Sequence, residues 1–175
     1  MKKLILITAA LMMISSLAAA QTTASGTLSV TATVNGSISL VFNTDTAGVA
    51  LTGSGTNAAT LAFGTVQAFG GTLTTGVTRT VGTGNFTVSS PFDVNVAKAN
   101  LTSANYTLKA QLNAADATNT WQVQGVTVTS GAAATVTGTG VYDTNNQLTL
   151  ALTIPFTTAS GTSISNSVNF TATAN

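Results

Sequence analysis

Strict alternation of apolar and polar positions governs most of this 175-residue chain. In the longest run, every second residue from Leu148 to Phe156 is large and apolar, and the residues between are threonine, alanine or proline. A period of two places neighbouring side chains on opposite faces of a β-strand. No stretch after residue 20 shows the 3.6-residue period of a helix. The pattern therefore predicts an all-β protein.

Shorter alternating runs fill the rest of the chain, and stretches rich in Gly, Asn and Asp separate them. The runs lie at 61–66, 85–90, 92–96, 106–112 and 121–128. Strands of this length and spacing favour an all-β sandwich or barrel. Inside the last run, Gly125 shifts the phase between Val123 and Val126, which predicts a β-bulge.

The first twenty residues have the pattern of a Sec-type signal peptide. Two lysines precede an apolar run from Leu4 to Ile14, and three alanines end the segment at Ala20. We expect cleavage to leave Gln21 as the N-terminus and to deliver the chain to the periplasm, then to the cell surface or the medium. No later stretch is long and apolar enough to span a membrane, so we expect no span in the mature protein.

Charge is scarce after the signal peptide, where three basic and four acidic side chains leave a net charge of −1. The lack of a basic cluster argues against nucleic-acid binding and against electrostatic attachment to a membrane. The chain also contains no Cys, His or Glu, so the common nucleophile–base pairs and most zinc ligand sets cannot be built. We expect neither an enzyme nor a metal or cofactor.

Residues 27–42 form an unusually long alternating run, in which the apolar residues keep to even positions on both sides of Gly36. A two-residue hairpin at Asn35–Gly36 would put the apolar residues before and after it on opposite faces, at high cost. Two alternatives keep one apolar face. One is a three-residue loop that pairs Val34 with Ile38; the other is a single extended run bent at Gly36, whose halves serve different partners.

The chain closes with a further alternating run. Its apolar face carries Val168, Phe170, Ala172 and Ala174. We expect a C-terminal strand that turns this face toward a core.

Five segments, in their order and spacing, resemble bacterial surface proteins of the spore coat protein U type and, more broadly, the subunits of chaperone–usher pili. They read SVTATVNGSISL (29–40), LAFGTV (61–66), YTLKAQL (106–112), LTLALTIP (148–155) and SVNFTATA (167–174). The resemblance implies an immunoglobulin-like, pilin-like antiparallel β-sandwich. The chain departs from these families in lacking cysteine pairs and in carrying Ala174, rather than an aromatic residue, next to last.

Such subunits assemble by strand donation, in which the N-terminal extension of one subunit completes the sandwich of another. After the signal peptide at 1–20, the resemblance implies an N-terminal extension at 21–36 and a sandwich domain at 37–175. The donor strand would be Thr27–Val34, which would insert Leu28, Val30, Ala32 and Val34, with Gly36 as the hinge. The C-terminal strand would lie beside the accepting groove.

The resemblance also implies an exported structural or adhesive surface protein. Its partners would be further copies of itself or related subunits, with a periplasmic chaperone and an outer-membrane usher.

Other interpretations stay open. Residues 27–34 fold back in one of them and close their own sandwich. In another, the protein is a secreted, self-complete monomer that binds carbohydrate or ice, for which threonine pairs would provide a flat hydroxyl face. These pairs are Thr31/Thr33, Thr127/Thr129, Thr135/Thr137 and Thr171/Thr173. A small outer-membrane barrel is disfavoured, because aromatic residues make up only 6% of the chain. Trp121 alternates in phase with Val123, which predicts a core position for it rather than a sugar-stacking one.

Overall fold

A computed structural model describes residues 24–175 of the chain. The predicted signal peptide therefore lies outside the described residues. The described chain separates into a unit that ends at Thr33 and a unit Val34–Asn175, called the body below. Residues 24–33 contain no strand, and their side chains are exposed.

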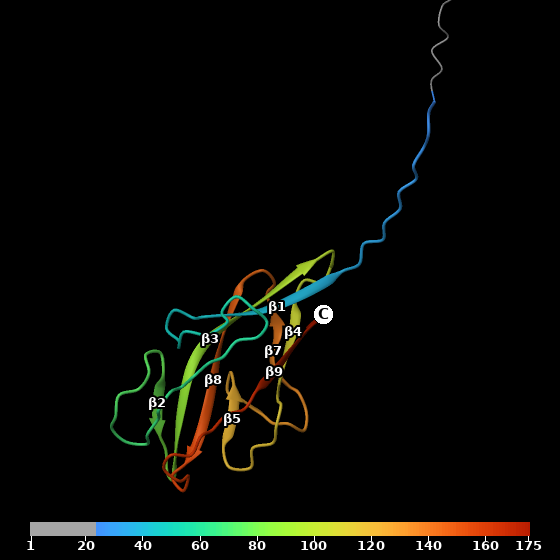
Figure 1. Ribbon diagram of the computed structural model, residues 1–175. Coiled ribbons are helices and arrows are strands. Elements are labelled where there is room, and N and C mark those ends of the chain that lie inside the picture. The colour runs from blue at the N-terminus through green and yellow to red at the C-terminus, as the bar shows by residue number, and fades with distance from the viewer. Residues whose placement is uncertain (1–23) are drawn as a thin grey trace, which may run out of the picture. The chain divides into compact units, whose positions relative to one another are not determined.

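Nine strands and no helix make up the secondary structure of the described residues (Figure 1). The strands are β1 (Ser37–Asn43), β2 (Thr78–Val81), β3 (Asn85–Ala99), β4 (Tyr106–Leu112), β5 (Thr120–Val123), β6 (Val126–Val128), β7 (Ala134–Gly140), β8 (Asn145–Pro155) and β9 (Val168–Ala174). Every strand pairing is antiparallel. The prediction of an all-β, antiparallel protein is confirmed. Among these residues no helix exists that could cross a membrane.

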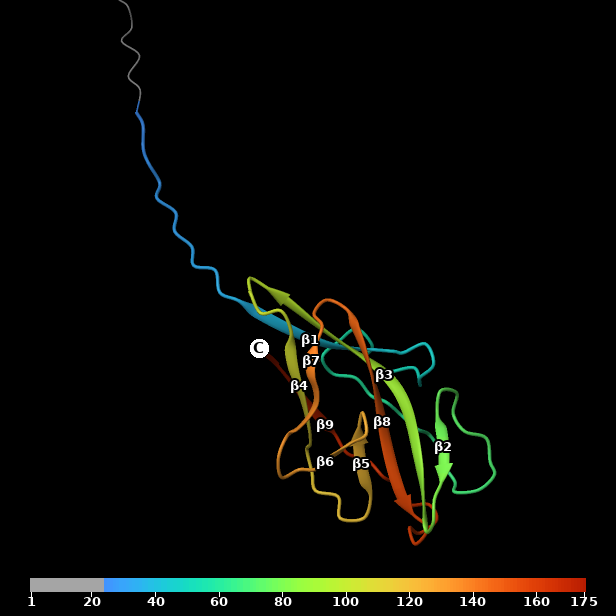
Figure 2. The same cartoon turned by 180° about the vertical axis from the view of Figure 1, so that it is seen from behind.

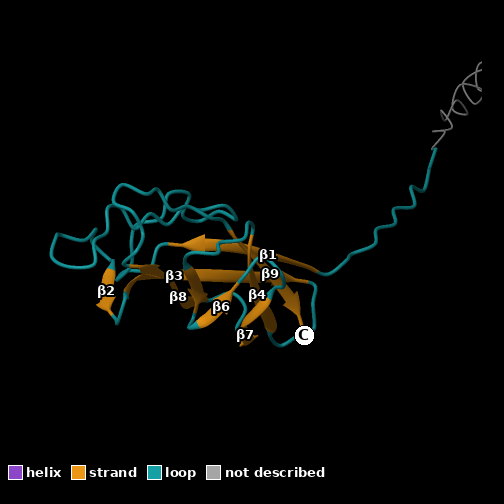
Figure 3. Cartoon of the chain, turned by 90° about the horizontal axis from the view of Figure 1, so that it is seen from below, coloured by secondary structure: helices purple, strands orange, loops and turns teal. Residues whose placement is uncertain are grey.

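The strands form two sheets arranged as a β-sandwich (Figure 2). The larger sheet has the order β1-β3-β8-β5-β6, with β2 also paired to β3, and the smaller has the order β7-β4-β9. Even-numbered residues of β3, β4 and β8 face the core between the sheets, as the alternation requires. The long connection from β1 to β2 gathers on one side of the strands (Figure 3).

Strand β3 is long because two partners share one of its edges. β1 pairs with its second half and β2 with its first half, so the runs predicted at 85–90 and 92–96 are one strand. Pro91 lies between those two partners. Thr149 of β8 lies opposite Pro91. Its backbone groups point toward β5, and its carbonyl oxygen accepts a hydrogen bond from the backbone N–H of Gln124. The nitrogen of Pro91 therefore faces the gap between β1 and β2, where no ladder bond is lost.

The predicted bulge at Gly125 is wrong, because the chain makes a hairpin there. β5 and β6 pair Trp121 with Val128 and Val123 with Val126 across the two-residue turn Gln124–Gly125. Both turn residues have positive φ, 51° and 75°, as a type I′ turn requires. The phase shift in the sequence comes from this turn.

The predicted strand at 61–66 is also absent. Gly64 has a φ of 71°, which breaks the extended run, and no ladder joins the segment to a neighbour. Leu61 and Phe63 are nevertheless half-buried and pack against the core. The segment is thus a wall of the body without being part of a sheet.

The loop that would pair Val34 with Ile38 is not formed, because Ile38 pairs with Lys98 of β3. Only residues 37–43 of the long N-terminal run are a strand. Gly36, the predicted hinge, packs so closely on Leu101 and the carbonyl oxygen of Asn100 that a Cβ atom there would overlap both. This close approach is what requires glycine at position 36.

Candidate functional site

A groove of about 800 Å³ opens between the two sheets of the body. Its floor is apolar and comes from the larger sheet: Val88, Phe92, Trp121, Leu150, Leu152 and Ile154. One wall is the segment 59–66, and the other is the segment 161–170, which includes the first residues of β9. The groove is therefore lined by core side chains that the sandwich leaves partly uncovered.

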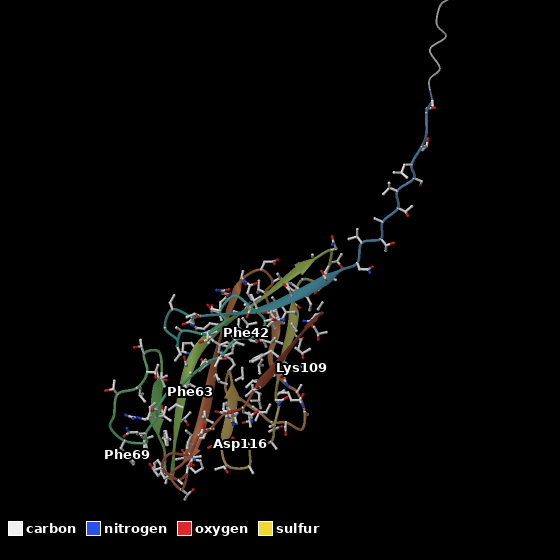
Figure 4. The ribbon with its side chains drawn as sticks, in the orientation of Figure 1. Phe42, Phe63, Phe69, Lys109 and Asp116 are labelled. Atoms are coloured by element: carbon white, nitrogen blue, oxygen red, sulfur yellow. The ribbon has the colours of Figure 1, made fainter. Side chains whose placement is uncertain are left out.

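The two walls are formed by segments without a complete set of strand partners. Residues 61–66 and 163–167 belong to no strand, although Leu61, Phe63 and Ile164 turn toward the core and are half-buried. Figure 4 labels Phe63 and Phe42, two of the aromatic residues that line the groove. An added strand between these walls would find apolar side chains beneath it and backbone on each side.

Burial differs sharply between β4 and β9, although the two strands are neighbours in one sheet. The inward side chains of β4, from Tyr106 to Leu112, are at most 4% exposed. The inward side chains of β9 remain only half-buried. β9 thus presents a core-type face that the described residues do not fully cover.

One backbone edge of β9 is unpaired within the described part of the chain. β9 pairs only with β4, and the ladder is extended by Asn175 N–H donating to Asn105 O (3.1 Å) and Asn113 N–H donating to Ser167 O (2.8 Å). Odd-numbered residues of β9 therefore turn their backbone groups toward β4, and even-numbered residues turn theirs to the open side. We call this open side, at positions 168, 170, 172 and 174, the free edge.

The structure places the sequence-predicted site residues in two groups. Val168, Phe170, Ala172 and Ala174 are the inward residues of β9 and also carry the free edge; the first two line the groove. The four candidate donor residues are exposed, with Leu28 at 87%, Val30 at 80% and Val34 at 71%. They lie in a stretch that forms no strand.

Trp121 is buried, as predicted, and its polar atom is tied to a turn. The indole N–H donates to Asp116 Oδ2 at 2.8 Å, and Asp116 Oδ1 accepts from the backbone N–H of Thr118 and of Asn119. Partial burial alone would raise the pKa of Asp116, but these bonds and one from the Asn119 side chain outweigh it and lower the pKa to about 2. The indole therefore anchors the turn before β5 and is not free to stack on a sugar.

Two further carboxylates, Asp45 and Asp93, lie where β1, β3 and β8 adjoin. Asp45 is buried and accepts bonds from the side-chain amide of Gln147 (2.6 Å) and the N–H of Ala47 (2.8 Å). Burial, and then the charge of Asp45, raise the pKa of Asp93, while a bond from Asn145 opposes them. These contacts tie the connection after β1 to the sheet. Residues 24–175 contain no cluster of three metal-ligating Asp, Glu, His or Cys side chains.

The threonine pairs predicted from the sequence do not belong to one sheet. Thr127 lies on β6 of the larger sheet, with Thr129 just after it, whereas the pairs Thr135/Thr137 and Thr171/Thr173 lie on β7 and β9 of the smaller sheet. The pair Thr31/Thr33 belongs to the unit before the body. A different row appears across four strands of the larger sheet: Thr80, Thr87, Thr153 and Thr120 are successive cross-strand neighbours. The hydroxyls of Thr87 and Thr153 lie 2.7 Å apart. Sequence reasoning missed this row because its members come from distant segments.

No family profile, curated protein or solved structure matches this chain.

Proposed function

We propose that this protein is an exported structural or adhesive subunit that assembles with further copies of itself by β-strand complementation. In this proposal the body is an immunoglobulin-like, pilin-like sandwich that lacks one strand. The extension of another copy supplies that strand, as in the surface proteins that the sequence resembles. A periplasmic chaperone and an outer-membrane usher belong to the same proposal as assembly partners.

The observation that carries the proposal is the free edge of β9 beside the groove. An unpaired edge is a ready template for another strand, and the adjoining apolar floor offers sites for alternate side chains of that strand. The half-buried inward face of β9 supports the same conclusion, because an added strand would complete its burial.

The extension has the pattern that such a groove requires. Residues 27–34 span eight positions and the wall 161–170, which ends in β9, spans ten, so the extension is long enough to run along most of this wall. Leu28, Val30 and Ala32 alternate with threonine or serine, which gives the segment one apolar and one polar face. Moving exposed Leu and Val side chains into the groove would stabilise the assembly by about 1.5–3 kcal/mol for each fully buried side chain.

The test compares V30D with T31D in the mature protein, Gln21–Asn175, by size-exclusion chromatography and negative-stain electron microscopy. Val30 would face the groove and Thr31 would face solvent, and both positions are exposed before assembly. We expect the unmodified protein and T31D to form fibres or ladders of oligomers. V30D should remain a monomer, because a carboxylate would be buried without a partner.

Assembly of V30D at the level of T31D would show that this segment is not the donor. A clean monomer for the unmodified protein, with or without a chaperone, would remove strand complementation altogether.

A second candidate, a self-complete secreted module that binds carbohydrate or ice, is favoured by the row of four threonines across β2, β3, β8 and β5. Adjacent strands of a sheet lie ~4.8 Å apart, so one threonine on each of four neighbouring strands forms a regularly spaced row. A T87V/T153V double variant would then lose thermal hysteresis or polysaccharide binding while keeping its fold. Absence of both activities in the unmodified protein would remove this candidate.

A further inference from the structure

The groove has two different ends. At one end the rings of Phe42, Phe92 and Phe170 pack together, with centroids 5.3 to 6.4 Å apart. Phe42 belongs to β1, so the first strand of the body occupies this end. At the other end the wall turns at Gly161, whose φ is 80°, and the floor ends with Ile154.

An exposed aromatic pair borders this second end. Phe156 comes two residues after Ile154 of the floor, and Phe69 comes three residues after Val66 of the wall. The two ring centroids are 5.4 Å apart, yet Phe69 is 68% exposed and Phe156 41%. We call Phe69 and Phe156 the rim pair; Figure 4 labels Phe69 at the end of the body toward which β8 runs.

The loop that carries Phe69 is held in place by one cation. The Arg79 guanidinium donates to the carbonyl oxygens of Gln67 (2.8 Å) and Gly70 (2.6 Å) on either side of Phe69. A ring presented on a fixed loop loses little conformational entropy on binding. The exposed ring of Phe69 is therefore held in a fixed position where a partner can reach it.

Only a short link joins the donor strand to its own body. Its length determines which part of the donating copy lies next to the groove of the accepting copy. The donor ends at Val34, and the chain packs against its own body by Gly36, beside Leu101. Two residues span at most about 7 Å. The body of the donating copy must therefore touch the accepting copy where the donor leaves the groove. β1 occupies the end of the groove at Phe42, Phe92 and Phe170, so the donor must leave the groove at its other end, beside the rim pair. In this orientation the donor runs antiparallel to β9.

We infer, on the basis of the proposed function, that the rim pair docks the body of the donating copy. The docked surface is the one around Gly36: the turn 100–105 and the adjacent tip at Val141. Val141 is 56% exposed, and the tip is tied to the turn by the Ser103 and Tyr142 hydroxyls, 3.3 Å apart. The contact joins opposite ends of two copies, so it is heterologous and can repeat from one copy to the next.

Single-cysteine variants test this contact, because the chain has no cysteine of its own. F69C copies are mixed with V141C copies during assembly, and a short bismaleimide is added after microscopy has shown fibres. The matched control mixes F69C with K109C, because Lys109 is exposed on the outer face of β4, away from both ends (Figure 4). We expect cross-linked dimers in the first mixture at a yield at least about tenfold above the control.

Each other outcome contradicts the inference in a different way. Cross-linking of F69C copies alone would mean that two rim pairs face each other. Fibres with no F69C–V141C product would leave strand complementation intact but remove this contact. If no fibres form at all, the proposed function fails first, and microscopy records that failure separately from the cross-linking result.

Discussion

Asp116 holds the turn before β5 through a carboxylate that accepts bonds from Thr118, Asn119 and Trp121. Burial opposes its ionisation, but the bonds win and lower its pKa to about 2. A carboxyl whose folded pKa lies below its unfolded value of about 3.8 stabilises the fold above pH 4. That contribution is lost as the pH falls through about 4 toward 2.

We therefore expect D116N to be less stable than the unmodified protein at pH 7, because an amide N–H would face the indole N–H of Trp121. The difference in unfolding free energy should narrow as the pH falls from about 4 to about 2. Urea unfolding of both proteins across this range measures it. Asp93, whose pKa is raised, is present in both proteins, so its contribution to the pH dependence cancels when the two unfolding free energies are subtracted. A difference in unfolding free energy that does not change with pH would contradict the lowered pKa of Asp116.

At the scale of elements, β9 has two backbone edges with different roles. Asn169 turns its N–H toward Gln111 of β4, whereas Val168, which lines the groove, turns its N–H to the free edge. Substitutions at neighbouring residues of this strand can therefore test the stability of the fold and its capacity to accept a strand independently.

Proline at these two positions gives a matched pair of variants. N169P removes a ladder bond and should lower the free energy of unfolding by about 1–3 kcal/mol. V168P removes no bond within the body and should cost less, yet it should block assembly because proline cannot donate to an added strand. Urea unfolding and size-exclusion chromatography measure the two effects. If V168P assembles as well as the unmodified protein, the free edge is not the acceptor.

At the scale of the whole molecule, the body and the residues before it form separate units. We expect a variant that begins at Asn35 to fold and to stay monomeric. A synthetic peptide of residues 27–34 should raise its melting temperature, since a ligand that binds only the folded state stabilises it by about 2.7 kcal/mol at a hundredfold excess over Kd. The same peptide with Asp in place of Val30 is the control. Equal effects of the two peptides, or none from either, would contradict strand complementation.

Local pattern was sufficient wherever a strand keeps its alternation along its whole length. The runs at 106–112 and 148–155, and the buried Trp121, follow from period two alone, because a half-buried sheet needs one apolar face. The alternation pattern gave wrong predictions where the local structure depends on the backbone conformation of single residues. The Gln124–Gly125 hairpin and the interruption at Gly64 depend on positive φ, which the same glycines would also permit in a bulge or a loop.

Alternation along the chain was enough to predict the all-β class and the face that each long strand turns inward. The tertiary structure alone decided which strands are neighbours, and hence that β9 has a free edge, that 59–66 and 161–170 enclose a groove, and that Phe69 meets Phe156. The physical reason is that alternation is a property of one strand, while pairing depends on backbone bonds between segments far apart in the chain.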